Sequence, residues 1–141
     1  MICVNQGQYN TPIATCSRNK QLSNPYYLWT IRHKLSNQTW QFIPYREQSI
    51  TTYPPSYDVF QLDIFSNVPE VYIGDTGTTC NLHLIPGEYY VKIYEQVSST
   101  NLNPKLSYDV VYEGMAIVNY SASTAPIQYS GTSDIYKVYE G

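Results

Sequence analysis

The chain has 141 residues, a net charge of −3 and only 13% charged residues, whereas an ordinary soluble domain has about 25%. Its length suits a single globular domain with its own core. Because it has neither a basic run nor an apolar run of membrane length, its composition argues against binding nucleic acid or inserting into a membrane.

The N-terminal residues 1–24 are polar, and nothing in them repeats at helix or strand period for long. They are expected to form an extended arm, with the compact domain beginning at residue 25. The first segment of that domain, 26–33, alternates between apolar and polar residues. Tyr27, Trp29 and Ile31 share one face, which is typical of a half-buried strand.

A second strand is expected over residues 39–47, where Trp40 and Phe42 share a face, and the two segments together read as a β-hairpin. Residues 49–57 are expected to be a loop, since two adjacent prolines cannot lie in a central strand. The clearest alternation is over 58–65. Its expected inward residues are Phe60, Leu62 and Ile64, and its expected outward residues are Val59, Gln61 and Asp63.

Later segments follow the same pattern. A short strand is expected at 70–73, and residues 80–84 lead through a Pro-Gly turn into a strand over 88–97. A long strand is expected over 106–120, with a bulge at Gly114.

No segment has sustained helical periodicity, so the sequence predicts an all-β fold, an antiparallel β-sandwich of the Ig-like or prealbumin-like kind. The sandwich is assigned to residues 25–120. It is flanked by the N-terminal arm at 1–24 and by a C-terminal arm at 121–141, whose composition is that of a linker.

The residues that could bind a metal or cofactor do not cluster. Cys3, Cys16 and Cys80 are odd in number and lack metal-ligand spacing, so free thiols in a reducing compartment are expected. His33 and His83 have no ligand partner at metal spacing. There is no glycine-rich phosphate loop. No metal and no cofactor is therefore expected.

The strongest indication of catalysis is Asp75-Thr76-Gly77, which matches the aspartic-protease triplet. A chain of this length would have to dimerise to supply a second aspartate. The apolar residues that should follow the triplet are replaced by threonines. A turn between two strands explains the same residues, so no enzymatic activity is expected.

Tyrosine, which occurs 16 times, suggests binding to a protein. In the 88–97 strand, Tyr89, Val91 and Ile93 are expected in the core, which puts Tyr90, Lys92 and Tyr94 on the outward face. Tyrosine offers contact area at small entropy cost, so these three residues are the predicted partner interface. Exposed aromatic residues on a β-sandwich also suit stacking on sugars, which leaves a glycan-binding module as an alternative.

Four segments, in this order, resemble a group of small virion proteins of phages that infect Bacteroidetes-type bacteria, including the crAss-like phages. They are NPYYLWTI, TWQFIP, LIPGEYYVKIYEQVSSTNLNP and YEGMAIV, within residues 24–120. The most specific part is Leu84-x-Pro86-Gly87-x-Tyr89, continued by Val91-x-Ile93-Tyr94-Glu95 and later by Asn101-Leu102-x-Pro104.

The resemblance implies a non-enzymatic structural role in the phage particle, with the chain assembled into the virion in the host cytoplasm. The first expectation is an auxiliary (decoration) capsid protein bound to the major capsid protein. The alternative is a head–tail connector ring or a tail subunit, in contact with connector or portal-ring proteins. In either role, the chain is expected to bind further copies of itself in a symmetric assembly.

Overall fold

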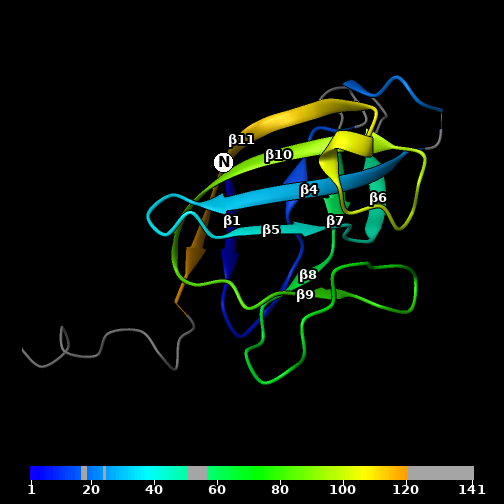
Figure 1. Cartoon of the computed structure of the whole chain (residues 1–141). Helices are drawn as coiled ribbons and strands as arrows, with labels where there is room; N and C mark the ends of the chain where they lie inside the picture. The colour runs from blue at the N-terminus through cyan, green and yellow to red at the C-terminus, as the bar shows by residue number, and fades with distance from the viewer. Residues whose placement is uncertain (17–18, 24, 51–56, 121–141) are drawn as a thin grey trace, which may run out of the picture.

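The computed structural model (Figure 1) describes residues 1–16, 19–23, 25–50 and 57–120. Its strands are β1 (Ile2–Asn5), β2 (Tyr9–Asn10), β3 (Ile13–Ala14), β4 (Tyr26–His33), β5 (Thr39–Phe42), β6 (Arg46–Ile50), β7 (Tyr57–Phe60), β8 (Leu62–Asp63), β9 (Cys80–Asn81), β10 (Gly87–Gln96) and β11 (Asp109–Asn119). One 3-10 turn, η2 (Pro104–Leu106), precedes β11. The described residues include no α-helix, so the all-β prediction is confirmed.

The strands form two layers. A five-stranded sheet has the order β1-β11-β10-β4-β5, and two three-stranded sheets have the orders β2-β8-β9 and β3-β7-β6. The layers meet in one hydrophobic core, to which both contribute. Phe60 of β7 packs edge-on against Trp29 and Tyr27 of β4, with ring centroids 5.1 and 5.9 Å apart. This packing gives the molecule its sandwich character.

The period-2 alternation correctly identified the inward faces of the long strands. Trp29 and Ile31 of β4 are buried, and so are Tyr89, Val91 and Ile93 of β10. The hairpin of β4 and β5 is confirmed by antiparallel pairs that include Trp29 with Phe42 and Ile31 with Trp40.

The 58–65 segment also buries the residues expected of it, Phe60, Leu62 and Ile64. It does not form one strand, however. The backbone N–H of Gln61 donates to the Tyr45 carbonyl at 3.0 Å, and the chain passes there from β7 in one small sheet to β8 in the other.

Residues 1–16 belong to the sandwich, so the prediction of an N-terminal arm is wrong for them. Strand β1 pairs in parallel with β11, placing Ile2 opposite Ala116 and Val4 opposite Val118. Ile2 and Val4 are both buried in the core. Strands β2 and β3 pair with β8 and β7. These strands have two to four residues, too few to show a period in the sequence. The predicted C-terminal arm, 121–141, lies outside the described residues.

Two further expectations need correction. The sandwich is not wholly antiparallel, because the β1–β11 and β8–β9 pairs are parallel. The bulge in β11 is not at Gly114, which pairs with Val91. It lies at Val111, between the residues opposite Ile93 and Tyr94, and it lets Val111 join the core beside Tyr112.

Two shorter segments also differ from the sequence reading. In the expected loop 49–57, residues 49 and 50 end β6 and residue 57 begins β7, while 51–56 lie outside the described residues. Residues 70–73 form only isolated bridges, Val71 with Asn81 and Ile73 with Ile43, instead of a strand.

Candidate functional site

The predicted interface residues Tyr90, Lys92 and Tyr94 all lie on the outer face of β10, as the alternation required. Tyr90 is 46% exposed. Tyr94 is less exposed, and its pairing residue in β4, Leu28, is fully buried. The structure therefore favours Tyr90 over Tyr94 as an accessible contact residue.

Two cationic side chains lie close to the ring of Tyr90. The Arg32 guanidinium lies 4.7 Å from the ring centroid and the Lys34 ammonium lies 4.9 Å from it. Each cation also has a second partner. Arg32 donates to Asn37 Oδ1 at 2.8 Å, and Lys34 forms an ion pair with Glu88 at 2.9 Å. These cation–π contacts favour the observed orientation of the ring.

Lys92 pairs with Glu113 across the β10–β11 ladder at 3.7 Å. Both side chains are more than half exposed, so the pair adds little stability. It does balance charge on this face. The Tyr90 surface, defined as Arg32, Lys34, Glu88, Tyr90, Lys92 and Glu113, thus has an aromatic centre and charges of both signs around it.

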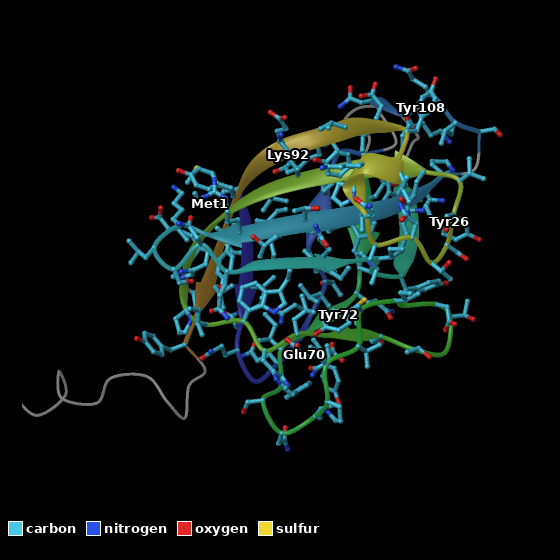
Figure 2. All side chains as sticks on the ribbon, viewed as in Figure 1. Met1, Tyr26, Glu70, Tyr72, Lys92 and Tyr108 are labelled. Atoms are coloured by element: carbon cyan, nitrogen blue, oxygen red, sulfur yellow. The ribbon has the colours of Figure 1, made fainter. Side chains whose placement is uncertain are left out.

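A second site was not expected from the sequence. It is a cleft of about 470 Å³ beside β5, lined by residues that include Trp40, Gln41, Glu70, Tyr72 and His83. In Figure 2, Lys92 lies above β5 whereas Glu70 and Tyr72 lie below it, and no residue that lines the cleft belongs to the Tyr90 surface.

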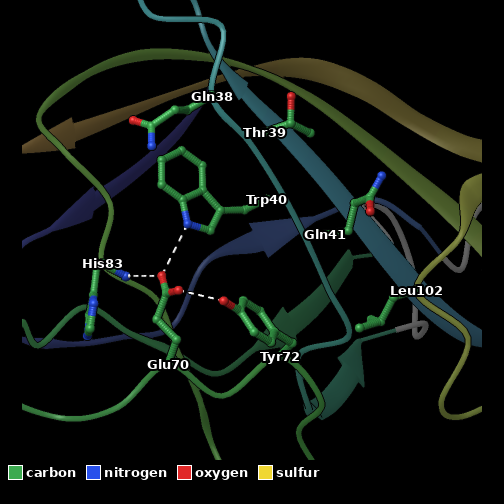
Figure 3. Close-up of a pocket in the computed structure, with 8 residues that line it drawn as sticks. All are labelled: Gln38, Thr39, Trp40, Gln41, Glu70, Tyr72, His83 and Leu102. Atoms are coloured by element: carbon green, nitrogen blue, oxygen red, sulfur yellow. Dashed lines mark hydrogen bonds between the residues drawn. The ribbon is translucent and has the colours of Figure 1, made fainter.

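Glu70 is the centre of this cleft (Figure 3). Its Oε2 accepts hydrogen bonds from the Trp40 indole N–H at 3.1 Å and from the His83 backbone N–H at 2.8 Å. Its Oε1 accepts a bond from the Tyr72 hydroxyl at 2.5 Å. Three donors from three chain segments therefore hold one carboxylate in place.

The hydrogen bonds of Glu70 shift its own pKa and that of Tyr72. Partial burial acts to raise the pKa of Glu70, but the hydrogen bonds from Tyr72, the His83 backbone and Trp40 outweigh burial and lower that pKa. The pKa of Tyr72 is raised, first by its hydrogen bond to Glu70 and then by burial. Glu70 is thus a carboxylate and Tyr72 a phenol at neutral pH.

One sequence signal could have identified this cleft. In the segment Glu70-Val71-Tyr72-Ile73, the polar-tipped residues alternate with apolar ones. Glu70 and Tyr72, two residues apart in extended chain, share the face that lines the cleft, and Val71 and Ile73 are not among the lining residues. The approach of Trp40 and His83 depends on the tertiary fold and could not be read from the sequence.

The other candidate residues have structural surroundings. Asp75 forms a turn, with its N–H donating to the Thr78 carbonyl at 2.8 Å and its Oδ1 accepting from the Gly77 N–H at 2.9 Å. This confirms the turn expected for the triplet. His33 is buried, its Nε2 lying 3.2 Å from the Pro86 carbonyl and its Nδ1 accepting from the Ser36 N–H.

The three cysteines are free thiols, as expected. Cys3 is exposed and the other two are buried. Burial raises the pKa of Cys80 to about 12, even though its thiol donates to the Ile43 carbonyl at 3.2 Å. Burial also raises the pKa of Cys16, and the nearby Asp58 raises it further. The two buried thiols are therefore poor nucleophiles and poor metal ligands.

Among the residues that the structure describes, no group of three or more His, Cys, Asp or Glu side chains is placed to hold a metal ion. Those same residues contain no helix with the length and apolarity needed to cross a membrane. Comparison of the chain with protein-family models, with curated proteins and with solved structures finds no match.

Proposed function

We propose that the protein is a non-enzymatic structural subunit of a bacteriophage particle, an auxiliary capsid protein that binds the major capsid protein. Two observations support this proposal. One is the resemblance of four segments within residues 24–120 to small virion proteins. The other is the Tyr90 surface, which has the composition of a protein contact.

The observation that carries the proposal is an exposed tyrosine, Tyr90, in contact with two cationic side chains. Tyrosine and arginine are enriched among residues that dominate binding energy at interfaces. Tyr90 stands 46% exposed with Arg32 and Lys34 close to its ring. Because the two cations favour one orientation of the ring, they would reduce the side-chain entropy that Tyr90 loses on binding. The charges of both signs around it suit a partner that also has charges of both signs.

The experiment begins with purified particles of the phage that encodes the chain. Mass spectrometry should detect the protein in many copies per particle, and cryo-electron microscopy should place it on the capsid surface with Tyr90 facing the major capsid protein. Absence of the protein from the particles would overturn the proposal. So would a location at the connector or the tail, which would favour the alternative role.

A matched pair of variants tests the surface itself. Tyr90→Ala and Tyr72→Ala each remove a tyrosine of similar exposure, 46% and 39%. Added to particles that lack the protein, Tyr90→Ala should bind more weakly by about tenfold or more, as expected when an interface anchor is truncated. Tyr72→Ala should bind as the wild type does. Equal binding of all three proteins would exclude the Tyr90 surface as the contact.

A further inference from the structure

The Glu70 cleft has binding capacity that its own hydrogen bonds leave unused. A carboxylate offers about four lone-pair positions, and Trp40, His83 and Tyr72 occupy three of them. One position remains on Oε1. Two further residues that line the cleft, Gln38 and Gln41, have side-chain amides that make no hydrogen bond within the described residues. Gln41 follows Trp40 in β5, so it lines the cleft from the opposite side of this strand (Figure 3).

The two aromatic rings have a specific orientation. Trp40 points its indole N–H, and Tyr72 its hydroxyl, toward the same carboxylate (Figure 3). Their polar edges are therefore engaged. Trp40 also packs against the core, with its ring centroid 6.0 Å from that of Tyr89, whereas Tyr72 is 39% exposed and offers its ring to a ligand in the cleft. A cage for a quaternary ammonium ion would instead direct ring faces at a common centre, and here that centre is occupied by Glu70.

We propose that this cleft binds a neutral pyranose sugar. The C–H face of such a sugar packs on an aromatic ring, and its hydroxyls donate to a carboxylate in a charge-assisted hydrogen bond. The amides of Gln38 and Gln41 both donate and accept, as neighbouring sugar hydroxyls require. A few fixed polar groups between aromatic side chains are the usual composition of a small-molecule site.

The charge of the site selects among sugars. Glu70 is the one carboxylate of the cleft lining, and its lowered pKa keeps it ionised at neutral pH. An acidic sugar such as N-acetylneuraminic acid would bring its own carboxylate close to Glu70, and like charges repel. The site should therefore reject acidic sugars.

A purely structural role for Glu70 accounts for only part of this arrangement. The three hydrogen bonds tie the 70–72 segment to β5 and to residue 83. That role requires neither the open position on Oε1 nor unpaired amides among the residues that line the cleft. The sugar site does not depend on the assembly role, because none of its residues belongs to the Tyr90 surface.

The two tryptophans of the chain give a direct test by nuclear magnetic resonance. The indole N–H of Trp40 donates to Glu70, whereas that of Trp29 is buried and has no hydrogen-bond partner among the described residues. The full chain, labelled with nitrogen-15, is titrated to high concentration with glucose, galactose, mannose, xylose, N-acetylglucosamine and their trisaccharides. At least one of these sugars should shift the Trp40 indole signal saturably and leave the Trp29 signal in place.

Variants then assign the binding to the cleft. Tyr72→Ala should weaken the affinity by about tenfold or more, and Gln41→Ala should weaken it to a smaller extent. Glu70→Gln keeps the size and an acceptor oxygen but loses the charge, so it should also weaken binding. Tyr90→Ala is the matched control and should bind like the wild type. An unmoved Trp29 signal confirms that each variant is folded.

Four results would overturn the proposal. The first is a Trp40 signal that no sugar in the set moves, and the second is equal affinity of the wild type and Tyr72→Ala. The third is binding of N-acetylneuraminic acid as tight as that of the neutral sugars. The fourth is a response to tetramethylammonium chloride alone, which would identify a cation site. None of these results bears on incorporation into particles.

Discussion

Two adjacent tyrosines with opposite orientations provide the sharpest test of the fold. Tyr89 is fully buried, donates to the Ile85 carbonyl at 2.6 Å and packs edge-on against His33 at 4.9 Å. Tyr90, the next residue, is 46% exposed. Replacing a buried aromatic with alanine costs about 3–5 kcal/mol of unfolding free energy. Replacing Tyr90 removes two exposed cation–π contacts and should cost about 1 kcal/mol.

The assay is urea denaturation of the two alanine variants and the wild type, with tryptophan fluorescence as the measure of unfolding. Tyr89→Ala should be less stable than Tyr90→Ala by about 2–4 kcal/mol, the difference between the two estimates above. In a domain of this size, the melting temperature changes by about 4 °C per kcal/mol of stability, so the melting temperatures of the two variants should differ clearly. Equal stabilities, or a greater loss in Tyr90→Ala, would refute the assigned faces of β10. Tyr89→Phe separates ring from hydroxyl and should cost about 1 kcal/mol.

Three further predictions concern other parts of the fold. Ile2→Ala should lower the unfolding free energy by about 2–4 kcal/mol in the same denaturation assay, because Ile2 is in the core. An unchanged midpoint of unfolding would instead support an N-terminal arm outside the core. Gly87→Ala should destabilise by more than about 1 kcal/mol, since Gly87 has φ +135° and an added Cβ would lie 2.6 Å from His33 Nε2; a neutral effect would contradict that backbone. The pKa of Glu70 is lower in the folded than in the unfolded protein. Its carboxylate therefore stabilises the fold above the unfolded value of about 4.3, and this contribution is lost as the pH falls through the folded pKa. Accordingly, Glu70→Gln should be less stable than the wild type at neutral pH, with a gap that closes in acid; a gap that widens in acid would reverse the assigned shift.

The sequence was informative where strands were long. Strands β4 and β10 have eight and ten residues, enough for alternation to identify the buried face, and the buried residues of 58–65 followed the same rule. It failed at β1, β2 and β3, which have four residues or fewer. A segment this short shows too few repeats to distinguish a strand from an extended arm.

The bulge position was missed for a different reason. A glycine in a strand suggests a bulge. At Gly114, however, the missing side chain leaves room for the ring of Tyr112. A Cβ there would lie 2.6 Å from the Tyr112 hydroxyl. Val111, the actual bulge residue, carries no such mark in the sequence.

The two candidate sites differ in how far the sequence could predict them. The outward face of β10 followed from one strand's alternation, so Tyr90 and Lys92 were placed correctly. The cations beside Tyr90 come from β4 and the turn after it, and only the pairing of β4 with β10 brings them close. The Glu70 cleft combines residues of β5, the 70–72 segment and residue 83. No local pattern connects those three segments, since their approach depends on the packing of both layers.

The pairing of β1 with β11 also determines when the chain can finish folding. The side chains of Asn5 and Asn119 are hydrogen-bonded although 114 residues separate them. During synthesis, β1 leaves the ribosome first, but its partner strand is the last of the described strands to emerge. Until β11 emerges, Ile2 and Val4 have no neighbouring strand beside which to enter the core, and β10 lacks its partner on one side. Contacts between such distant residues slow folding, so the native sandwich is expected to form after translation has passed residue 119. A nascent chain interrupted before that point would expose apolar surface to its neighbours.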